Sequence, residues 1–363
     1  MKLSIGIVGL PNVGKSTLFN ALLKKQVANV ANYPFCTIEP NVGVIEVPDE
    51  RLPVLAKIVN TTKIVPAAVE FYDIAGLVRG ASTGEGLGNK FLSHIREVAA
   101  IVHVVRLFDD DNVVHVSNKI DPIDDIKTIT TELILADLAT LSKQSEPRMN
   151  ATKEEKYAFE TIKLLKDKLN QGITAKNSNL SDDQLKSVNQ LNLLTLKPVI
   201  YVFNLSEKQL ENMTETQKRI NEVMSIIGEN SETLSLCAKL ENEILVLSEE
   251  EQNEYLQQYS LSELGLNRLI KTAYRVLNLI SFLTAGEIEV KAWTITKGTK
   301  APKAAAVIHT DFENHFIKAD VVKYDDFVEY QGWAKARELG KVRSEGKDYI
   351  IDKNEVVEFK IGT

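Results

Sequence analysis

The chain has 363 residues, of which 44% are hydrophobic and 26% are charged. A chain of this length and composition has enough apolar material for two or three folded domains. Its formal net charge of −7 excludes the global positive field that drives non-specific nucleic-acid binding. Any contact with RNA would therefore need a local basic patch.

The cysteines and the start of the chain indicate the compartment. Only Cys36 and Cys237 occur, and they lie far apart, which predicts free thiols in a reducing compartment rather than a disulfide framework. An apolar strand begins at Leu3, which leaves no room for a signal peptide, and no run of about 18 apolar residues is present. We therefore expect a cytoplasmic protein without a membrane span.

Short apolar segments alternate with helical patterns along most of the chain. Those expected to be strands cover residues 3–8, 42–47, 69–72, 101–105, 198–203 and 233–236. This alternation predicts an α/β fold, in which a mostly parallel sheet carries helices on both faces.

The alternation is interrupted between residues 125 and 194, where the sequence is polar and apolar residues recur at helical spacing. The last helical segment begins at the capping box of Ser181 and Gln184, and Leu185, Val188 and Leu191 share its apolar stripe. We expect a coiled-coil-like helical arm here, inserted into a sheet domain made of residues 1–124 and 195–280. Alternatively, these helices simply cover the sheet.

The composition changes after a helix predicted over residues 264–279. Residues 290–295 are strand-like, and residues 356–361 alternate between apolar and polar side chains. We expect residues 281–363 to form a separate small α+β domain.

The most informative motif is Gly9-Leu10-Pro11-Asn12-Val13-Gly14-Lys15-Ser16-Thr17, which fits G-x-x-x-x-G-K-[ST]. It lies between a predicted strand and a predicted helix, where the glycines let the backbone wrap a phosphate and point its N–H groups at the anion. We expect Lys15 to reach the β- and γ-phosphates and the Ser16 hydroxyl to hold Mg²⁺. The predicted phosphate-site residues are Asn12, Val13, Gly14, Lys15, Ser16 and Thr17.

A second motif distinguishes a nucleotide switch from other P-loop proteins. Asp73-Ile74-Ala75-Gly76 follows a predicted strand and fits D-x-x-G. Asp73 would hold a Mg²⁺-bound water, and the Gly76 amide would sense the γ-phosphate. Thr37 lies where a first switch loop belongs and is the natural second protein ligand of Mg²⁺, although it could be an ordinary loop threonine. The predicted metal ligands are Ser16, Thr37 and Asp73.

Base recognition departs from that of ordinary GTPases. Asn204-Leu205-Ser206-Glu207 ends a predicted strand where guanine-binding proteins have N-K-x-D. The longer Glu207 displaces the paired contact that an Asp makes with guanine, and Leu205 offers an apolar surface instead of a lysine stem. A loosened hydrogen-bonding site discriminates less, so we hypothesise that ATP is bound, with GTP weaker. Cys237-Ala238-Lys239 stands at the S-A-K position, whose backbone supports the base.

Hydrolysis is expected to be slow. Leu77 stands directly after the D-x-x-G motif, where many GTPases have a glutamine that orients the attacking water. Because leucine can neither donate nor accept a proton, we expect a turnover on the order of 10⁻³ s⁻¹ or below. His115 could supply the missing function, although it could also be a surface histidine, and we expect His94 and His103 to be structural. A K⁺ ion held partly by Asn12 could add positive charge. With negligible turnover, the chain would be a nucleotide-gated binding protein instead.

Together these motifs resemble the YchF family, the Obg-like ATPases within the Obg branch of P-loop GTPases. The resemblance covers nearly the whole chain and rests on residues 9–17, 33–40, 73–77, 84–88 and 204–207. Residues 311–321 resemble the family's C-terminal TGS domain, which implies a β-grasp fold. The resemblance also implies a coiled-coil arm at the helical insertion and a role for a histidine from the region of His115.

The same resemblance implies a translation-linked ATPase that associates with the ribosome, either the large subunit or the 70S particle. Contact with ribosomal RNA would use the basic residues of the last domain, which are interleaved with acids. These are Lys291, Lys297, Lys300, Lys303, Lys335, Arg337, Lys341, Arg343 and Lys347. A conventional Obg-type GTPase is the remaining alternative, and base preference separates the two.

Overall fold

The computed structural model describes residues 3–28, 41–74, 87–109, 120–148, 150–228 and 231–362. The chain forms two compact units. One comprises Met1–Lys24, Pro40–Gly43 and Phe71–Leu266, and the other comprises Lys25–Glu39, Val44–Glu70 and Asn267–Thr363. Residues 44–70 thus group with the C-terminal segment, although they precede the boundary expected at residue 281. The domain division itself stays a prediction.

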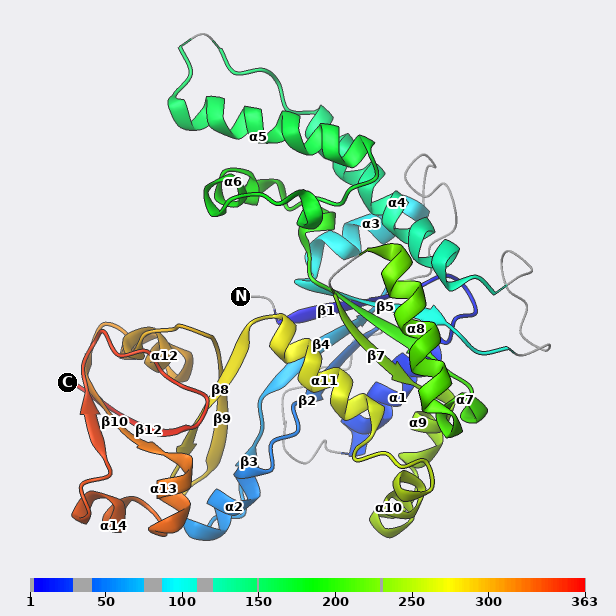
Figure 1. Cartoon of the computed structure of the whole chain (residues 1–363). Helices are drawn as coiled ribbons and strands as arrows, with labels where there is room; N and C mark the ends of the chain where they lie inside the picture. Colours follow the sequence, from blue (N-terminus) through cyan, green and yellow to red (C-terminus); the bar gives the residue numbers. More distant parts are fainter. Residues whose placement is uncertain are drawn as a thin grey trace. The chain divides into compact units, whose positions relative to one another are not determined.

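A six-stranded sheet with the order β2-β4-β1-β5-β6-β7 organises the first part of the chain (Figure 1). Its strands are β1 Ser4–Val8, β2 Val42–Glu46, β4 Ala68–Asp73, β5 Ala100–Arg106, β6 Val199–Asn204 and β7 Glu232–Leu236. Pairing is parallel from β1 to β5, β6 and β7. Every residue of β1 and β5 is buried, as expected for parallel strands that are covered on both faces. The α/β prediction and all six predicted strands are confirmed.

Helices follow most of these strands. They are α1 Lys15–Ala28, α3 Leu87–Glu97, α7 Glu207–Glu211, α8 Met213–Ile227, α9 Ala238–Ile244, α10 Glu249–Gln258 and α11 Gly265–Val276. In a parallel sheet the loops that leave the carboxyl ends of the strands meet at one edge, which is where ligands bind in this class of fold.

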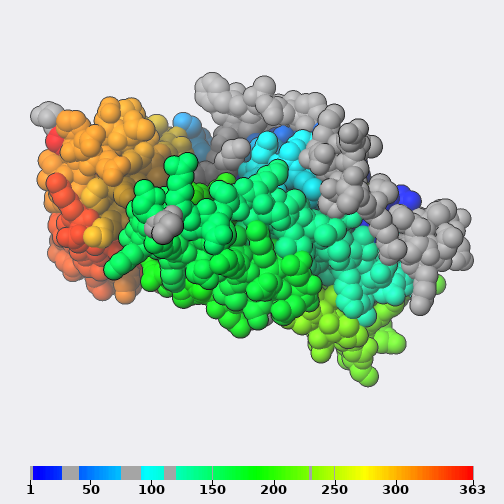
Figure 2. Space-filling model, turned by 90° about the horizontal axis from the view of Figure 1, so that it is seen from above, coloured from blue at the N-terminus to red at the C-terminus, as the bar shows by residue number. Residues whose placement is uncertain are grey.

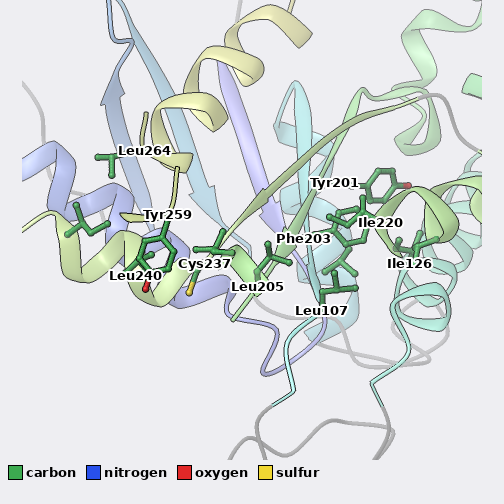
Figure 3. Close-up of a cluster of buried hydrophobic side chains, with 14 residues drawn as sticks. Leu107, Ile126, Tyr201, Phe203, Leu205, Ile220, Cys237, Leu240, Tyr259 and Leu264 are labelled. Carbon is green, nitrogen blue, oxygen red and sulfur yellow. The ribbon is translucent and has the colours of Figure 1, made fainter. Parts of the chain in front are cut away.

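A cluster of buried hydrophobic side chains packs beneath the loops at this edge of the sheet (Figure 3). It combines residues from the ends of three strands, namely Leu107, Leu205 and Cys237, with Leu240 of α9 and Ile220 of α8. Because these side chains are close-packed, the loops that carry them have little freedom to shift.

The helical insertion has a core of its own. The insertion consists of the helices α4 Pro122–Ser142, α5 Lys153–Asn170 and α6 Asp182–Val188. These helices form a continuous surface in the space-filling view (Figure 2). The residues that share this core are Ile134, Leu141, Ile162, Leu165, Leu169, Ala175, Val188 and Leu193. The buried Asp137 of α4 accepts hydrogen bonds from the N–H groups of Leu194 and Thr195, each at 2.8 Å. This carboxylate therefore joins the first helix of the insertion to the segment that returns to the sheet.

One detail of the predicted stripe is wrong. The capping box of Ser181 and Gln184 is present, but Leu185 is 38% exposed. The reason is that α6 ends at Val188 and a 3₁₀ turn covers Asn189–Leu191, so Leu185, Val188 and Leu191 do not share one α-helical face.

The second sheet has the order β11-β10-β12-β8-β9-β3. Its strands are β8 Leu279–Ala285, β9 Val290–Thr296, β10 Phe316–Lys323, β11 Arg343–Glu345, β12 Glu355–Ile361 and β3 Ile64–Val65. The accompanying helices are α2 Arg51–Ile58, α12 Ala301–Ile308, α13 Tyr324–Glu329 and α14 Trp333–Glu338. An antiparallel β8–β9 hairpin precedes α12, and the last strand, β12, lies parallel beside β8. This is the topology of a β-grasp fold.

The strands predicted over residues 290–295 and 356–361 are confirmed. The helix predicted over residues 264–279 is shorter than expected, because α11 ends at Val276 and Leu279 already begins β8. Among the described residues no helix is both long and apolar enough to cross a bilayer.

Candidate nucleotide-binding site

The loop between β1 and α1 has the backbone that a phosphate-binding loop requires. Asn12 and Gly14 adopt the left-handed conformation, with φ of 64° and 92°. A Cβ atom on Gly14 would lie 2.1 Å from Asn204 Nδ2, and one on Gly9 would lie 2.8 Å from the Val104 carbonyl oxygen. Only glycine fits at these two positions, because the loop packs directly against its neighbours. The loop leads straight into α1, whose first turn offers free backbone N–H groups to an anion.

The lysine of this loop meets the aspartate of the second motif. Lys15 Nζ lies 3.0 Å from Asp73 Oδ1, and both side chains are largely shielded from solvent, with exposures of 11% and 16%. The adjacency of β1 and β4 in the sheet produces this ion pair. The structure therefore brings together the predicted phosphate-binding lysine and the predicted metal-binding carboxylate.

The donor set fits magnesium. Asp73 supplies a carboxylate, and Ser16, an exposed residue in the first turn of α1, supplies a hydroxyl. Mg²⁺ prefers such hard oxygen ligands and usually takes one or two from the protein and the rest from phosphates and water. Among the described residues, no three or more His, Cys, Asp and Glu side chains are grouped so that they could hold a metal ion by themselves.

Several predicted site residues lie outside the described residues. These are Thr37, Gly76 and His115, together with Leu77 and Cys36. Their roles therefore stay predictions.

A cavity of about 340 Å³ adjoins the phosphate-binding loop. Its walls come from that loop and from the chain after β5, β6 and β7. The residues that line it are Gly14, Thr17, Phe108, Asp109, Asn204, Leu205, Ser206, Glu207, Cys237, Ala238 and Lys239. It thus collects all the predicted base-site residues.

Asn204 holds three of these walls together. Its Nδ2 donates to the Val13 carbonyl oxygen at 2.9 Å, and its Oδ1 accepts from the Ala238 N–H at 3.0 Å. The side chain is buried, so both bonds are shielded from water. An asparagine amide carries two hydrogens, and only one is needed for Val13. The second is available to a base acceptor, which both purines provide.

Glu207 makes a contact that bears on base preference. Its Oε1 lies 3.2 Å from Lys239 Nζ, and this hydrogen bond raises the pKa of Lys239. Glu207 also occupies the first turn of α7, which is capped by Ser206. A guanine would have to compete with Lys239 for this carboxylate.

Leu205 and Cys237 lie on the inner side of the cavity. Both line the cavity, but their side chains are only 2% and 3% exposed and belong to the core drawn in Figure 3. Burial raises the pKa of the Cys237 thiol. They form the apolar floor of the cavity, and Cys237 is a free thiol, as predicted.

Sequence reasoning missed part of the wall after β5. Phe108 and Asp109 line the cavity, and Gln209 donates from Nε2 to the Leu107 carbonyl oxygen at 2.9 Å. The fully buried Arg106 donates from Nε to the Phe108 carbonyl oxygen at 3.1 Å. The rule that ligands bind beyond the carboxyl ends of parallel strands would have identified Phe108 and Asp109.

Several of the basic residues of the C-terminal segment are paired with acids. Arg337 contacts Glu358 at 2.6 Å, Arg343 contacts Glu355 at 2.7 Å, and Lys300 contacts Asp348 at 2.7 Å. The ammonium of Lys291 lies 3.7 Å from the centre of the Trp293 ring. The acids predicted to interleave with these cations are therefore in direct contact with several of them.

Two family models match parts of the chain. Residues 4–139 match a model described as 50S ribosome-binding GTPase, and residues 279–362 match the YchF-GTPase_C model, described as a protein of unknown function. Among curated relatives, the "Ribosome-binding ATPase YchF" of Bacillus subtilis is 51% identical over 99% of both chains. The protein of the same name from Haemophilus influenzae is 48% identical over 99% of both chains.

A solved structure extends the likeness to three dimensions. The YchF GTPase of Schizosaccharomyces pombe aligns with a TM-score of 0.88 and 37% identity. The alignment covers 99% of this chain and 98% of that one. The likeness therefore includes the sheet domain, the helical insertion and the C-terminal segment.

Proposed function

This chain belongs to the YchF family, and from that membership and the site we propose that it is a slow ATPase whose nucleotide state controls association with the ribosome. The P-loop domain and the ATPase names of the relatives support nucleotide hydrolysis. Their names also include ribosome binding, which supports the ribosome as the partner and the cytoplasm as the place of action.

The observation that carries the choice of ATP is the pairing of Glu207 with Lys239. In a guanine-specific site a carboxylate accepts hydrogen bonds from the base. Without these bonds the site loses much of its discrimination between guanine and adenine. Here the carboxylate is longer by one methylene and is already bound to a lysine at 3.2 Å. Asn204 keeps a hydrogen that is suitable for either purine, so ATP is bound without penalty.

For the phosphate end we propose that Lys15 leaves Asp73 and binds the β- and γ-phosphates. Asp73 and Ser16 would then hold Mg²⁺, together with Thr37. The ion, when bound, supplies positive charge that neutralises the phosphate oxygens. Asn12, Val13, Gly14 and Thr17 would complete the phosphate site through the loop backbone.

We further propose that His115 orients the attacking water and that the Gly76 amide contacts the γ-phosphate. With Leu77 in the place of a glutamine, turnover stays on the order of 10⁻³ s⁻¹ or below. K⁺ beside Asn12 would raise this rate by adding positive charge near the bridging oxygen. Replacing K⁺ by Na⁺ in the assay tests this point.

Affinity for ATP and GTP, measured side by side by calorimetry with Mg²⁺ present, tests the proposal first. We expect tighter binding of ATP, and slow phosphate release that Lys15→Ala abolishes. Strong preference for GTP would make the chain a conventional Obg-type GTPase. Tight ATP binding without phosphate release above the uncatalysed rate would make it a nucleotide-gated binding protein.

We propose the large subunit or the 70S particle as the binding site, with contact to ribosomal RNA through the basic residues of the C-terminal segment. Co-sedimentation with purified 50S and 70S ribosomes, with ATP or ADP present, tests this. Binding that depends on the nucleotide supports the proposal, and equal binding with both nucleotides contradicts the switch.

A further inference from the structure

Gln209 touches two of the loops that form the base cavity without lining the cavity itself. Its Oε1 accepts a hydrogen bond from the Ser206 N–H at 2.9 Å, which closes the capping box of α7. Its Nε2 donates to the Leu107 carbonyl oxygen, also at 2.9 Å. The first bond stays within the loop after β6, whereas the second reaches the loop after β5. Gln209 therefore ties two walls of the cavity together.

The loop after β5, to which Gln209 bonds, is held in place by several contacts. Leu107 precedes Phe108 and Asp109, which line the cavity. The guanidinium carbon of Arg106 lies 4.5 Å from the centre of the Phe108 ring, and Arg106 Nε bonds the Phe108 carbonyl oxygen. The Leu107 N–H, in turn, donates to the Asn204 carbonyl oxygen at 3.0 Å. Gln209 adds the side-chain bond that fixes the Leu107 carbonyl from the opposite loop.

A capping box does not by itself require a glutamine. The same box is closed by Glu155 at the start of α5 and by Glu251 at the start of α10. A glutamate can accept from the backbone N–H, but it cannot donate to the Leu107 carbonyl oxygen, because an ionised carboxylate is acceptor-only. The amide is therefore needed for the bond between the two walls and not for the cap.

We propose that Gln209 is a positioning residue for purine recognition, and that its bond to Leu107 sets the spacing between the wall of Phe108 and Asp109 and the loop of Asn204 and Glu207. This inference rests on the proposed function. A pocket whose walls are already in place loses less freedom when a ligand binds, so its affinity is higher. Losing the bond weakens binding of the base and leaves binding of the phosphates unchanged.

The test compares Gln209→Glu and Gln209→Met with the unmodified protein. Glutamate keeps the cap and removes the donor, whereas methionine removes both the donor and the cap acceptor but adds no charge, so that the lost donor is what the two variants share. Gln184→Glu is the matched control, because the Gln184 side chain closes the capping box of α6 and makes no second hydrogen bond among the described residues. Thermal unfolding of each variant reports whether the fold is intact.

Affinity for ATP and for inorganic tripolyphosphate is measured with Mg²⁺ present. Both Gln209 variants are expected to bind ATP about 3- to 10-fold more weakly, the range of one neutral hydrogen bond, and to bind tripolyphosphate as before. KM for ATP rises by the same factor and kcat is unchanged, since KM equals the dissociation constant when chemistry is slow. Gln184→Glu changes none of these values.

ATP affinity within twofold of the unmodified protein in Gln209→Met would overturn the inference. An equal loss of affinity for ATP and tripolyphosphate would also overturn it, because the role would then be general to the fold. If the unmodified protein binds GTP instead of ATP, the proposed function is wrong about which base is bound. The Gln209 variants are then compared for their affinity for GTP.

Discussion

Asn204 and Gly14 depend on each other at the scale of single residues. The Asn204 amide reaches the Val13 carbonyl oxygen only because Gly14 has no side chain in its path. Gly14 also has a φ of 92°, which is strained for any other residue. Two independent constraints therefore select glycine at this position.

We predict that Gly14→Ala abolishes nucleotide binding and lowers the free energy of unfolding by more than about 2 kcal/mol, from backbone strain plus the clash with Asn204. Gly172→Ala is the matched control, because Gly172 has a φ of 78° but open space around it. It should cost only about 1 kcal/mol of backbone strain and leave ATP affinity unchanged. Calorimetry and urea unfolding check both variants, and ATP binding by Gly14→Ala would contradict the prediction.

We predict that Glu207→Asp shifts preference from ATP toward GTP. The shorter carboxylate restores the length that guanine recognition needs, and it lies farther from Lys239, whose bond to Glu207 is 3.2 Å long. The ratio of the dissociation constants for ATP and GTP is expected to change by about tenfold, which is the effect of one hydrogen bond to a charged group. Lys239→Ala provides the comparison, since it frees the carboxylate without changing its length. An unchanged ratio in Glu207→Asp would show that base preference comes from elsewhere in the cavity.

At the scale of elements, α5 and α6 of the helical insertion are stabilised apart from the nucleotide site, whereas α4 also contributes Ile126 to the cluster beneath the base cavity. The core of the insertion contains Leu165 and Leu169 of α5 and Val188 of α6, while the base cavity rests on a different cluster. Asp137 joins its two ends through Leu194 and Thr195. Loosening α5 and α6 should therefore leave the cavity intact.

We predict that Leu165→Ala lowers the stability of the insertion by about 3 kcal/mol, because the side chain is fully buried and leaves a cavity. Hydrogen exchange in α5 and α6 should accelerate, and ATP affinity should stay the same. Leu185→Ala is the matched control, since Leu185 is exposed, and it should change stability by less than about 1 kcal/mol. A loss of ATP affinity in Leu165→Ala would show that the insertion and the site are coupled.

At the scale of the whole molecule, one buried histidine links global stability to pH. His103 lies in the middle of β5, its ring centre is 5.4 Å from that of Tyr201, and burial lowers its pKa to about 3. This agrees with the structural role predicted for it. In the unfolded chain a histidine has a pKa of about 6.5, so the unfolded state takes up a proton first as the pH falls.

Protonation of the unfolded state must therefore destabilise the fold between about pH 6.5 and pH 3. We predict that His103 contributes about 2 kcal/mol to the stability lost between about pH 7.5 and pH 5. His103→Phe should remove this contribution to the pH dependence of the free energy of unfolding. The variant therefore becomes more stable relative to the unmodified protein as the pH falls. Thermal unfolding at both pH values checks this, with the exposed His94→Gln as the control. A pH dependence equal in His103→Phe and the unmodified protein would contradict it.

Much of the fold could be predicted because local patterns determine it. The strands of the first sheet, and β9 and β12 of the second, follow apolar or alternating runs of the right length, whereas β3, β8, β10 and β11 were not predicted. The phosphate-binding loop follows from Gly9, Gly14 and Lys15 alone. The capping box at Ser181 was also evident. The exposure of Leu185 was not, because the end of a short helix depends on packing rather than on periodicity.

For the site, the residues of the two motifs and of the base loops could be identified from the sequence, because their spacing places them after strands of a parallel sheet. The partners of these residues depend on how the chain folds. Lys15 meets Asp73, Glu207 meets Lys239, and Gln209 meets Leu107 because strands distant in sequence are neighbours in the sheet. Side-chain hydrogen bonds between such strands leave no periodic trace in the sequence, so the ties between the cavity walls could be seen only in the folded chain.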